Sequence, residues 1–275
     1  MDSNPARLLT SQEKIKICTF FLQTRNWWRY SGTLPLAGWS ILKVEVSLTL
    51  TKSALHGNYT RISRLCNMKI VILSDTHGFH EQITIPCGDI LIYAGDICHQ
   101  STINEIIQFD KFLAQLPHRY KIIIAGNHDF PFQNAPYRVK ASLCHCIYLQ
   151  DSGIEIEGIK IYGSPWQPWF FDWAFNLQRG RQIKEKWDLI PDDTDVLITH
   201  GPPFGILDTV DGHSEGCEEL LKAIYRIKPK YHIFGHIHEG YGQSFQNNTL
   251  FINASICNEH YQPVHDAHIC EWGAV

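Results

Sequence analysis

From Met68 onward, short apolar runs alternate with amphipathic segments, and this alternation restricts the possible folds more than any other feature of the chain. The apolar runs predict strands at Lys69–Leu73, Asp89–Ala94, Tyr120–Ala125, Ile154–Tyr162, Asp195–Thr199, His232–Phe234 and Leu250–Asn253. The amphipathic segments predict helices at Ile103–Leu116, Arg181–Leu189 and Glu215–Ile227. Continuously apolar strands with helices between them are typical of α/β layers.

Two segments carry additional local signals. Ile154–Tyr162 alternates apolar and polar residues around Gly158, which predicts a hairpin rather than a single strand. Thr102 and Glu105 have the spacing of a capping box at the start of the first predicted helix. We therefore expect that helix to begin directly after Thr102.

Residues 1–67 differ from the rest of the chain. They contain no metal-ligand spacing, and only Leu42–Leu50 alternates in the manner of a strand. Met68 immediately precedes the first predicted core strand. We therefore predict an N-terminal extension at 1–67, either disordered or forming a peripheral cap, and a working domain at 68–275.

The composition argues against several classes of protein. The formal net charge of −4, without a Lys/Arg-rich stripe, gives no basis for stable nucleic-acid binding. No apolar run is long enough to span a bilayer, and the first residues lack the pattern of a secretory signal. The nine cysteines are scattered without a Cys-x-x-Cys pair, which favours reduced thiols. We expect a cytoplasmic protein that does not bind membranes, with the oligomeric state left open.

Residues that can bind metal ions follow five of the predicted strands. They are Asp75-Thr76-His77, Gly95-Asp96, Gly126-Asn127-His128-Asp129, His200-Gly201 and Gly235-His236-Ile237-His238. In α/β folds, ligands bind at the carboxyl ends of strands, and carboxylate, imidazole and amide donors suit Mn, Fe, Zn or Ni. Any one of these motifs alone is compatible with a turn or an exposed strand end. Their joint occurrence in this order predicts a metal centre.

This order of motifs resembles the signature of the calcineurin-like metallophosphoesterases, which is Asp-x-His, Gly-Asp, Gly-Asn-His-(Asp/Glu), His and Gly-His-x-His. The resemblance covers essentially all of 68–275. Segments 161–169, 199–203, 234–242 and 252–255 resemble, more narrowly, the metallophosphoesterase domain-containing subgroup. That subgroup includes vertebrate proteins with cyclic-nucleotide and other phosphodiesterase activity. The resemblance implies an α/β fold, a four-layer αββα sandwich of two mixed β-sheets flanked by helices.

The resemblance also implies a role for each motif residue. One divalent metal ion would be held by Asp75, His77, Asp96 and His238. The other would be held by Asp96, Asn127, His200 and His236. Mn is the metal expected, with Fe, Zn, Ni or Mg as alternatives. Asp96 would bridge the pair, whose hydroxide attacks phosphorus, and His128, which is not a ligand, would protonate the leaving alkoxide.

One departure from the family pattern bears on the substrate. Phosphoprotein phosphatases of this superfamily continue Gly-Asp-x-x-Asp-Arg, whereas the run here is Gly95-Asp96-Ile97-Cys98-His99-Gln100. A neutral Gln100 cannot bind a phosphate dianion through two parallel hydrogen bonds as Arg does, which favours a phosphodiester substrate. His99 stands where the family has the Asp that orients the catalytic His. Either Asp129 or His99 is therefore expected to orient His128.

An aromatic run follows the predicted hairpin: Trp166, Trp169, Phe170, Phe171, Trp173 and Phe175. Most of these rings are expected to pack together as a small separate core. Trp166 or Trp169, nearest to the strand end, is predicted to stack on a substrate base. The other predicted substrate contacts are His99, Asn127 and His128.

These features together predict a dinuclear metal-dependent phosphodiesterase that hydrolyses small phosphodiesters such as cyclic nucleotides. A phosphomonoesterase or a nuclease on the same scaffold is the enzymatic alternative, although a nuclease would be expected to have a basic groove. The alternative from another class is a non-catalytic interaction module, as in the retromer scaffold subunit that shares this fold. Such a module can lose metal ligands or the catalytic His, whereas this chain keeps all of them.

Overall fold

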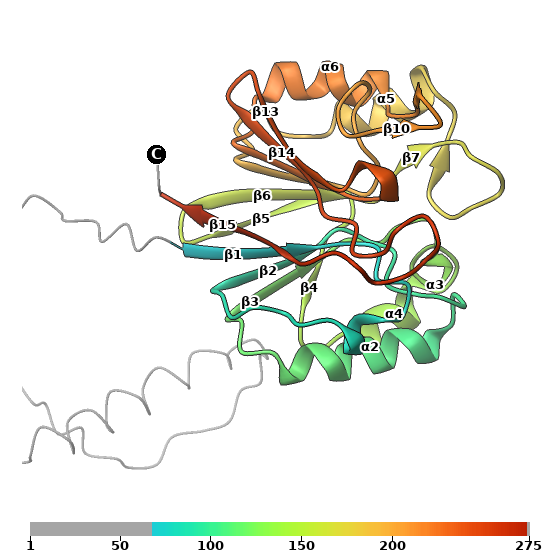
Figure 1. Ribbon diagram of the computed structural model, residues 1–275, viewed down its shortest axis with the longest axis vertical. Coiled ribbons are helices and arrows are strands. Elements are labelled where there is room, and N and C mark those ends of the chain that lie inside the picture. Colours follow the sequence, from blue (N-terminus) through green and yellow to red (C-terminus); the bar gives the residue numbers. More distant parts are fainter. Residues whose placement is uncertain (1–67, 274–275) are drawn as a thin grey trace, which may run out of the picture. The chain divides into compact units, whose positions relative to one another are not determined.

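The computed structural model describes residues 68–273, and the predicted N-terminal extension lies outside the described residues. Two β-sheets pack face to face with helices on both outer sides, which confirms the expected four-layer αββα sandwich (Figure 1). The five-stranded sheet contains, in spatial order, β15 (His268–Trp272), β1 (Met68–Leu73), β2 (Ile90–Tyr93), β3 (Tyr120–Ile123) and β4 (Ile147–Tyr148). The six-stranded sheet contains β13 (Gly242–Gln246), β14 (Thr249–Asn253), β12 (Tyr231–Phe234), β9 (Val196–Thr199), β6 (Ile159–Ser164) and β5 (Ser152–Ile156).

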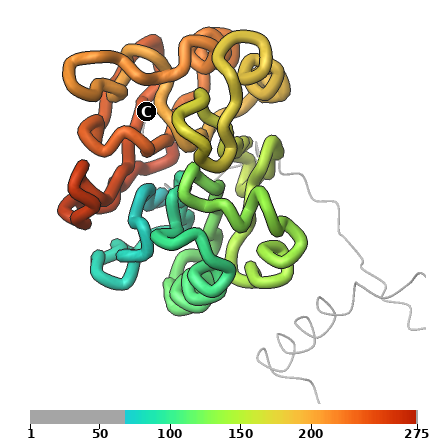
Figure 2. The backbone as a smooth tube through the Cα atoms, turned by 90° about the vertical axis from the view of Figure 1, so that its right-hand side faces the viewer, coloured from blue at the N-terminus to red at the C-terminus, as the bar shows by residue number. Residues whose placement is uncertain are grey.

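Both sheets are mixed, with parallel strands inside and antiparallel strands at edges. Strands β1 to β4 run parallel and β15 pairs antiparallel with β1. Strands β14, β12, β9 and β6 run parallel, flanked by antiparallel β13 and β5. The β5–β6 pair is the hairpin predicted around Gly158. The parallel strands of each sheet therefore end together, and the loops of both sheets meet on the side that faces the viewer in Figure 2.

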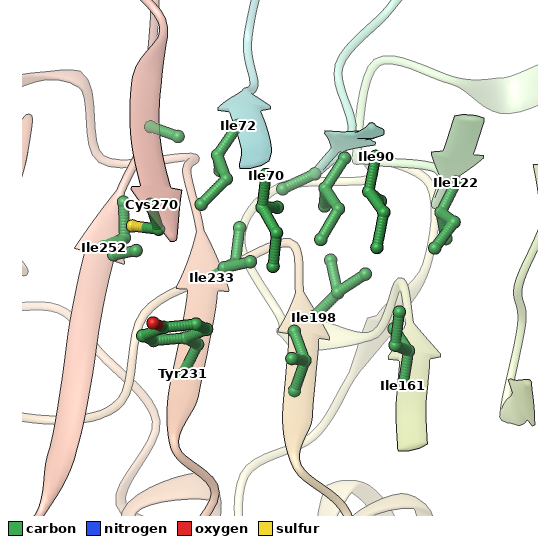
Figure 3. Packing of buried hydrophobic residues seen from close by; sticks show 14 of the residues in the cluster. Ile70, Ile72, Ile90, Ile122, Ile161, Ile198, Tyr231, Ile233, Ile252 and Cys270 are labelled. Atoms are coloured by element: carbon green, nitrogen blue, oxygen red, sulfur yellow. The ribbon is translucent and has the colours of Figure 1, made fainter. Parts of the chain in front are cut away.

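The space between the sheets is filled mainly by isoleucine side chains (Figure 3). Ile70 and Ile72 of β1 point into this layer, whereas Val71 and Leu73 point to the outer face, because successive strand residues face opposite ways. The six-stranded sheet contributes Ile161, Ile198, Ile233 and Ile252. Full burial of one such side chain stabilises the fold by about 1.5–3 kcal/mol, so this layer holds the two sheets in a fixed position relative to each other.

Helices pack on the two outer faces (Figure 1). On the five-stranded sheet these are α2 (Ile103–Gln115), α3 (Phe130–Asn134) and α4 (Pro136–Ser142). On the six-stranded sheet they are α5 (Arg181–Trp187) and α6 (Glu218–Ile227). Thr102 and Glu105 form the predicted capping box at the start of α2. Within residues 68–273, none of the helices has the length and apolar character needed to cross a membrane.

Several short elements were not predicted from the sequence. Besides α3, α4, β4, β13 and β15 they are η1 (His80–Gln82), β7 (Gln167–Pro168), β8 (Asn176–Leu177), β10 (Thr209–Val210), β11 (His213–Ser214) and η2 (His238–Gly240). Most of them are only two or three residues long, too short to show a periodic pattern.

A backbone junction joins the two sheets at their carboxyl edge. Ser74, which follows β1, forms a parallel bridge with Ser255, which follows β14. The Ser74 N–H donates to the carbonyl oxygen of Ala254 at 2.8 Å, and the Ile256 N–H donates to the carbonyl oxygen of Ser74 at 2.9 Å. The residue after Ser74 therefore emerges where the two sheets meet.

We expect a chain shortened to begin at Met68 to fold and to hydrolyse substrate at the rate of the full chain. Every helix and strand described above, and every predicted metal ligand, lies within 68–273. Thermal melting and turnover of the two chains, measured side by side, test this expectation. Aggregation or inactivity of the shortened chain would show that residues 1–67 are part of the fold.

A buried histidine in β12 makes stability depend on pH. His232 is fully buried, its Nε2 lies 2.8 Å from Thr199 Oγ1, and burial lowers its pKa to about 3. The unfolded chain protonates this ring below about pH 6.5, whereas the folded chain does so only near pH 3. The neutral ring therefore contributes stability that is complete above pH 6.5 and declines as the pH falls towards 3.

We expect His232→Gln to remove this contribution to the pH dependence. In urea unfolding between pH 7 and pH 4.5, the free energy of unfolding of the wild type should decline more steeply than that of the variant. The difference in slope should approach about 1.4 kcal/mol per pH unit. Other titrating groups are common to both proteins, so parallel slopes would contradict the assignment.

Candidate metal centre

The predicted metal ligands converge from both sheets on one site at the carboxyl edge. The five-stranded sheet contributes the residues that follow β1, β2 and β3: Asp75, His77, Asp96 and Asn127. The six-stranded sheet contributes those that follow β9 and β12: His200, His236 and His238. All of them are buried except His236, which is half-buried.

The first group consists of Asp75, His77 and His238, whose donor atoms lie within 4.8 Å of one another. The Nε2 atoms of His77 and His238 are 3.2 Å apart, and His238 Nε2 lies 3.5 Å from Asp75 Oδ1. The Nδ1 atom of His77 is buried without a hydrogen-bond partner in the described part of the chain. Three donors thus converge on one point.

The second group forms around the side-chain oxygen of Asn127. Its Oδ1 lies 2.8 Å from His200 Nε2 and 2.8 Å from His236 Nδ1. Asp96 lies between the two groups, with Oδ1 at 3.4 Å from His200 Nε2 and Oδ2 at 3.8 Å from His77 Nε2. A single carboxylate therefore reaches both groups, as a bridging ligand requires.

The backbone at the ligands is unusual. Asp75, His77, Asp96 and His236 all have positive φ, between 44° and 72°. Non-glycine residues rarely adopt this left-handed conformation, and such strain concentrates at functional sites. Gly235 makes room for one of these turns, since a Cβ atom there would fall on the Asp75 carboxylate.

Hydrogen bonds hold both carboxylates in place. The Asp75 carboxylate accepts hydrogen bonds from the Ser255 hydroxyl at 3.0 Å and from the His236 backbone N–H at 3.0 Å. The Asp96 carboxylate accepts a hydrogen bond from the His128 backbone N–H at 2.8 Å. Burial favours the protonated acids, but the neighbouring imidazoles outweigh it and hold the pKa of Asp75 and Asp96 well below the usual range. Within residues 68–273, only imidazoles form ion pairs with these two anions.

The histidines are oriented to present ring nitrogens to the site. His238 Nδ1 lies 2.8 Å from the Asn258 carbonyl oxygen, and His200 Nδ1 lies 3.0 Å from that of Ala94. Each ring donates its Nδ1–H to a carbonyl, so Nε2 faces the ligand cluster. Metal-binding histidines typically donate a hydrogen bond in this way from the ring nitrogen that does not bind the metal.

The carboxylates of the site attract positive charge, as the pKa values of the four histidines indicate. Burial alone would lower the pKa of His200 and His238, but the nearby carboxylates raise both to about 9. Burial lowers the pKa of His77 to about 4 and that of His236 to about 3, so these rings are neutral and able to coordinate. A metal ion can replace the protons that the anions attract to His200 and His238. The donors therefore fit divalent cations.

A cavity of 740 Å³ opens over the ligands. The aromatic loop supplies one wall through Trp169, Phe170, Phe171 and Trp173, and Tyr261 lies on another. Four carboxylates line it beyond the metal ligands: Asp172, Glu215, Glu239 and Glu259. Arg179 is its only Lys or Arg in the described chain, and the guanidinium donates to the carbonyl oxygens of Glu215 and Gly216.

The predicted substrate contacts are only partly brought together. Asn127, His128 and Trp169 line the cavity, but His99 and Trp166 do not. The His99 side chain is exposed and its ring lies 6.0 Å from that of Phe79. Trp166 instead donates its indole N–H to Asp151 at 2.8 Å and packs on the buried ring of Phe175, because its side chain turns towards the core.

Neither residue that was expected to orient His128 does so. Asp129 is buried and its carboxylate accepts the backbone N–H groups of Cys98 at 2.9 Å and Gly126 at 2.8 Å. Burial and the charge of Asp96 raise its pKa to about 7. Asp129 thus connects the loop after β2 to the loop after β3 through hydrogen bonds, and His99 is exposed and does not line the cavity.

Three residues at the site were not found from the sequence. Ser255 binds Asp75, Tyr261 lies with its ring centroid 4.7 Å from that of His77, and Trp173 lies against His128. Two of them carried a signal in the sequence: Ser255 ends the segment 252–255 that resembles the subgroup, and Trp173 belongs to the aromatic run. Tyr261 follows β14 outside every motif.

Comparisons with known proteins point to one family. A family profile described as calcineurin-like phosphoesterase matches residues 68–240. Human metallophosphoesterase domain-containing protein 1 is 45% identical over 222 residues, which cover 71% of this chain and 68% of that protein. A UPF0046 protein of Caenorhabditis elegans is 40% identical over 225 residues, covering 70% and 57% respectively.

One solved crystal structure covers 74% of this chain and 99% of its own, with a TM-score of 0.53. At 17% identity it supports the fold alone. The family profile, the relatives and the cluster of buried Asp and His donors agree. The chain therefore belongs to the calcineurin-like phosphoesterase family and is a metal-dependent phosphoester hydrolase.

Proposed function

We propose that the protein is a two-metal phosphodiesterase that hydrolyses small phosphodiesters, cyclic nucleotides among them. One metal ion is assigned to Asp75, His77, Asp96 and His238. The other is assigned to Asp96, Asn127, His200 and His236. The observation that carries this proposal is the position of Asp96, which lies 3.4 Å from a ring nitrogen of one group and 3.8 Å from a ring nitrogen of the other.

When bound, divalent cations lower the pKa of water and supply positive charge to the phosphate oxygens. The chain provides the remaining functions. The hydrogen bonds from Ser255 and from the His236 backbone hold Asp75 in one orientation. His128 lines the cavity, and one of its ring nitrogens lies within 4.8 Å of donor atoms of His77 and Asp96. We assign it not as a metal ligand but as the acid that gives a proton to the leaving alkoxide.

The charges around the cavity favour a diester over a monoester. A phosphodiester carries one negative charge, whereas a phosphomonoester carries nearly two at neutral pH. Gln100 is exposed and offers no charge, and Arg179, the cavity's one Lys or Arg among residues 68–273, is partly occupied by backbone carbonyls. Four carboxylates around the same cavity disfavour a dianion, and a polyanionic nucleic acid still more.

The size and lining of the cavity support a small substrate with a flat group. Its 740 Å³ is within the range of small-molecule sites. Trp169, Phe170 and Phe171 are each more than half exposed, so their faces are available to a ring such as a nucleobase. We also propose a cytoplasmic location, supported by the free thiols of the described cysteines.

We expect activity to depend on the metal ions in a residue-specific way. Chelation should abolish turnover, and Mn should restore it. Asp96→Asn should reduce the metal content by about two ions per chain, because Asp96 is shared, whereas Asp75→Asn should reduce it by about one. The exposed Asp188→Asn on the surface near α5 serves as a control with unchanged metal content.

Elemental analysis by mass spectrometry after gel filtration gives the counts. Full activity in chelated protein with no metal restored would contradict the proposal. Equal metal loss in Asp75→Asn and Asp96→Asn would contradict the bridging role of Asp96.

We expect His128→Ala to keep its metal content and to slow hydrolysis by about 10²–10⁴-fold when the leaving alcohol is poor. With a nitrophenyl leaving group the loss should be much smaller, because that oxygen leaves without a proton. Turnover of alkyl and nitrophenyl diesters by the same preparations provides the comparison. Equal slowing of both would mean that His128 positions substrate or water rather than donating a proton.

A further inference from the structure

The ring of His128 has no hydrogen-bonding partner among the side chains of residues 68–273. Its backbone is held, since the N–H donates to Asp96 Oδ1 at 2.8 Å and the carbonyl oxygen accepts the Ser101 hydroxyl at 2.5 Å. These bonds fix the main chain but do not by themselves set the rotation of the imidazole about its side-chain bonds. A general acid must nevertheless hold its N–H towards the leaving group.

Trp173 lies directly against this imidazole. The two ring centroids are 4.2 Å apart and the ring planes are inclined by 31°. The two rings are therefore tilted relative to each other and in close contact, and such contacts between aromatic rings are favourable.

The position of Trp173 is itself fixed relative to His128. The N–H of Ala174 donates to the carbonyl oxygen of Asn127 at 3.1 Å, so the residues next to each ring are bonded to each other. Ala174 and Phe175 are buried in the outer core of the five-stranded sheet. The aromatic loop is therefore anchored at this end, whereas Phe171, two residues earlier than Trp173, is 65% exposed.

Two other rings also lie near His128. The His77 ring meets it edge-on, with centroids 4.6 Å apart and an interplanar angle of 84°. The Tyr261 ring lies 6.1 Å away at 65°. Contacts of this kind restrict rotation of the imidazole without occupying either of its nitrogens.

We propose that Trp173 is the positioning residue for His128, and that it orients the imidazole by stacking against it. The inference rests on the proposed role of His128 as general acid. Stacking leaves both ring nitrogens open, one to give a proton to the leaving group and the other to exchange with water. A hydrogen-bonded carboxylate would occupy one of them.

The test compares Trp173→Leu with Trp173→Phe in the full chain loaded with Mn. Leu removes the flat ring, and Phe keeps it. For an alkyl diester we expect kcat to fall about tenfold in Trp173→Leu, the size of one aromatic contact. For a nitrophenyl diester kcat should change less than about twofold, and Trp173→Phe should restore most of the activity on both substrates. If Trp173→Leu does not fold, Trp173→Met gives the same comparison.

The same substitutions in the His128→Ala background separate positioning from substrate contact. If Trp173 acts through His128, then Trp173→Leu should slow the alkyl diester no further once His128 is absent. Trp169→Leu, which removes another ring from the same cavity, serves as the matched control. We expect it to raise KM by the same factor with and without His128.

The outcomes distinguish this inference from the proposed function. Suppose that His128→Ala slows the alkyl diester much more than the nitrophenyl diester, as expected of an acid. If Trp173→Leu then slows both substrates equally, or lowers kcat both in the wild type and in His128→Ala, the positioning role is overturned and the acid role stands. If His128→Ala itself lacks the leaving-group dependence, the acid role fails and the inference fails with it. If His128→Ala and Trp173→Leu each slow the alkyl diester more than the nitrophenyl diester, and the double variant is no slower than His128→Ala, both the acid role of His128 and the positioning role of Trp173 are supported.

Discussion

The site depends on the packing of two sheets against each other through a layer of isoleucine side chains. Because this layer fixes the sheets, the carboxyl ends of β1, β2 and β3 lie beside those of β9 and β12. Neither sheet alone supplies the complete set of donors, since the carboxylates come from one and three of the histidines from the other. The bridge between Ser74 and Ser255 joins the sheets at the same edge. The fold therefore creates the site by placing the carboxyl-terminal edges of the two sheets next to each other.

The second constraint is electrostatic. Asp75 and Asp96 are buried as anions in a region where, among the described residues, only imidazoles pair with them. Burying such charges is unfavourable unless they are neutralised. Left-handed backbone at four of the ligands adds strain, which the surrounding hydrogen bonds must offset. A site that combines buried anions, neutral imidazoles and strained turns is adapted to bind cations rather than to stabilise the fold.

The sequence patterns predicted the α/β class, the long strands, the hairpin around Gly158 and the cap of α2, because each depends on a local pattern. The four-layer arrangement was implied only by the resemblance to the calcineurin-like metallophosphoesterases. The sequence also placed every metal-ligand motif at a strand end, where the structure brings them together. What it missed depends on long-range contacts. The ring that lies against His128 comes from position 173, and the side chain that binds Asp75 comes from position 255. His99 and Trp166 were expected at the site from their positions in the sequence, but His99 is exposed outside the cavity and Trp166 packs on Phe175.

The most direct test of the two-metal account is anomalous diffraction from crystals of the Mn-loaded protein, recorded at the Mn absorption edge. Two peaks are predicted in each chain. One should lie among Asp75, His77 and His238, and the other among Asn127, His200 and His236, with Asp96 in contact with both. A single peak, or a second peak away from Asp96, would contradict the account.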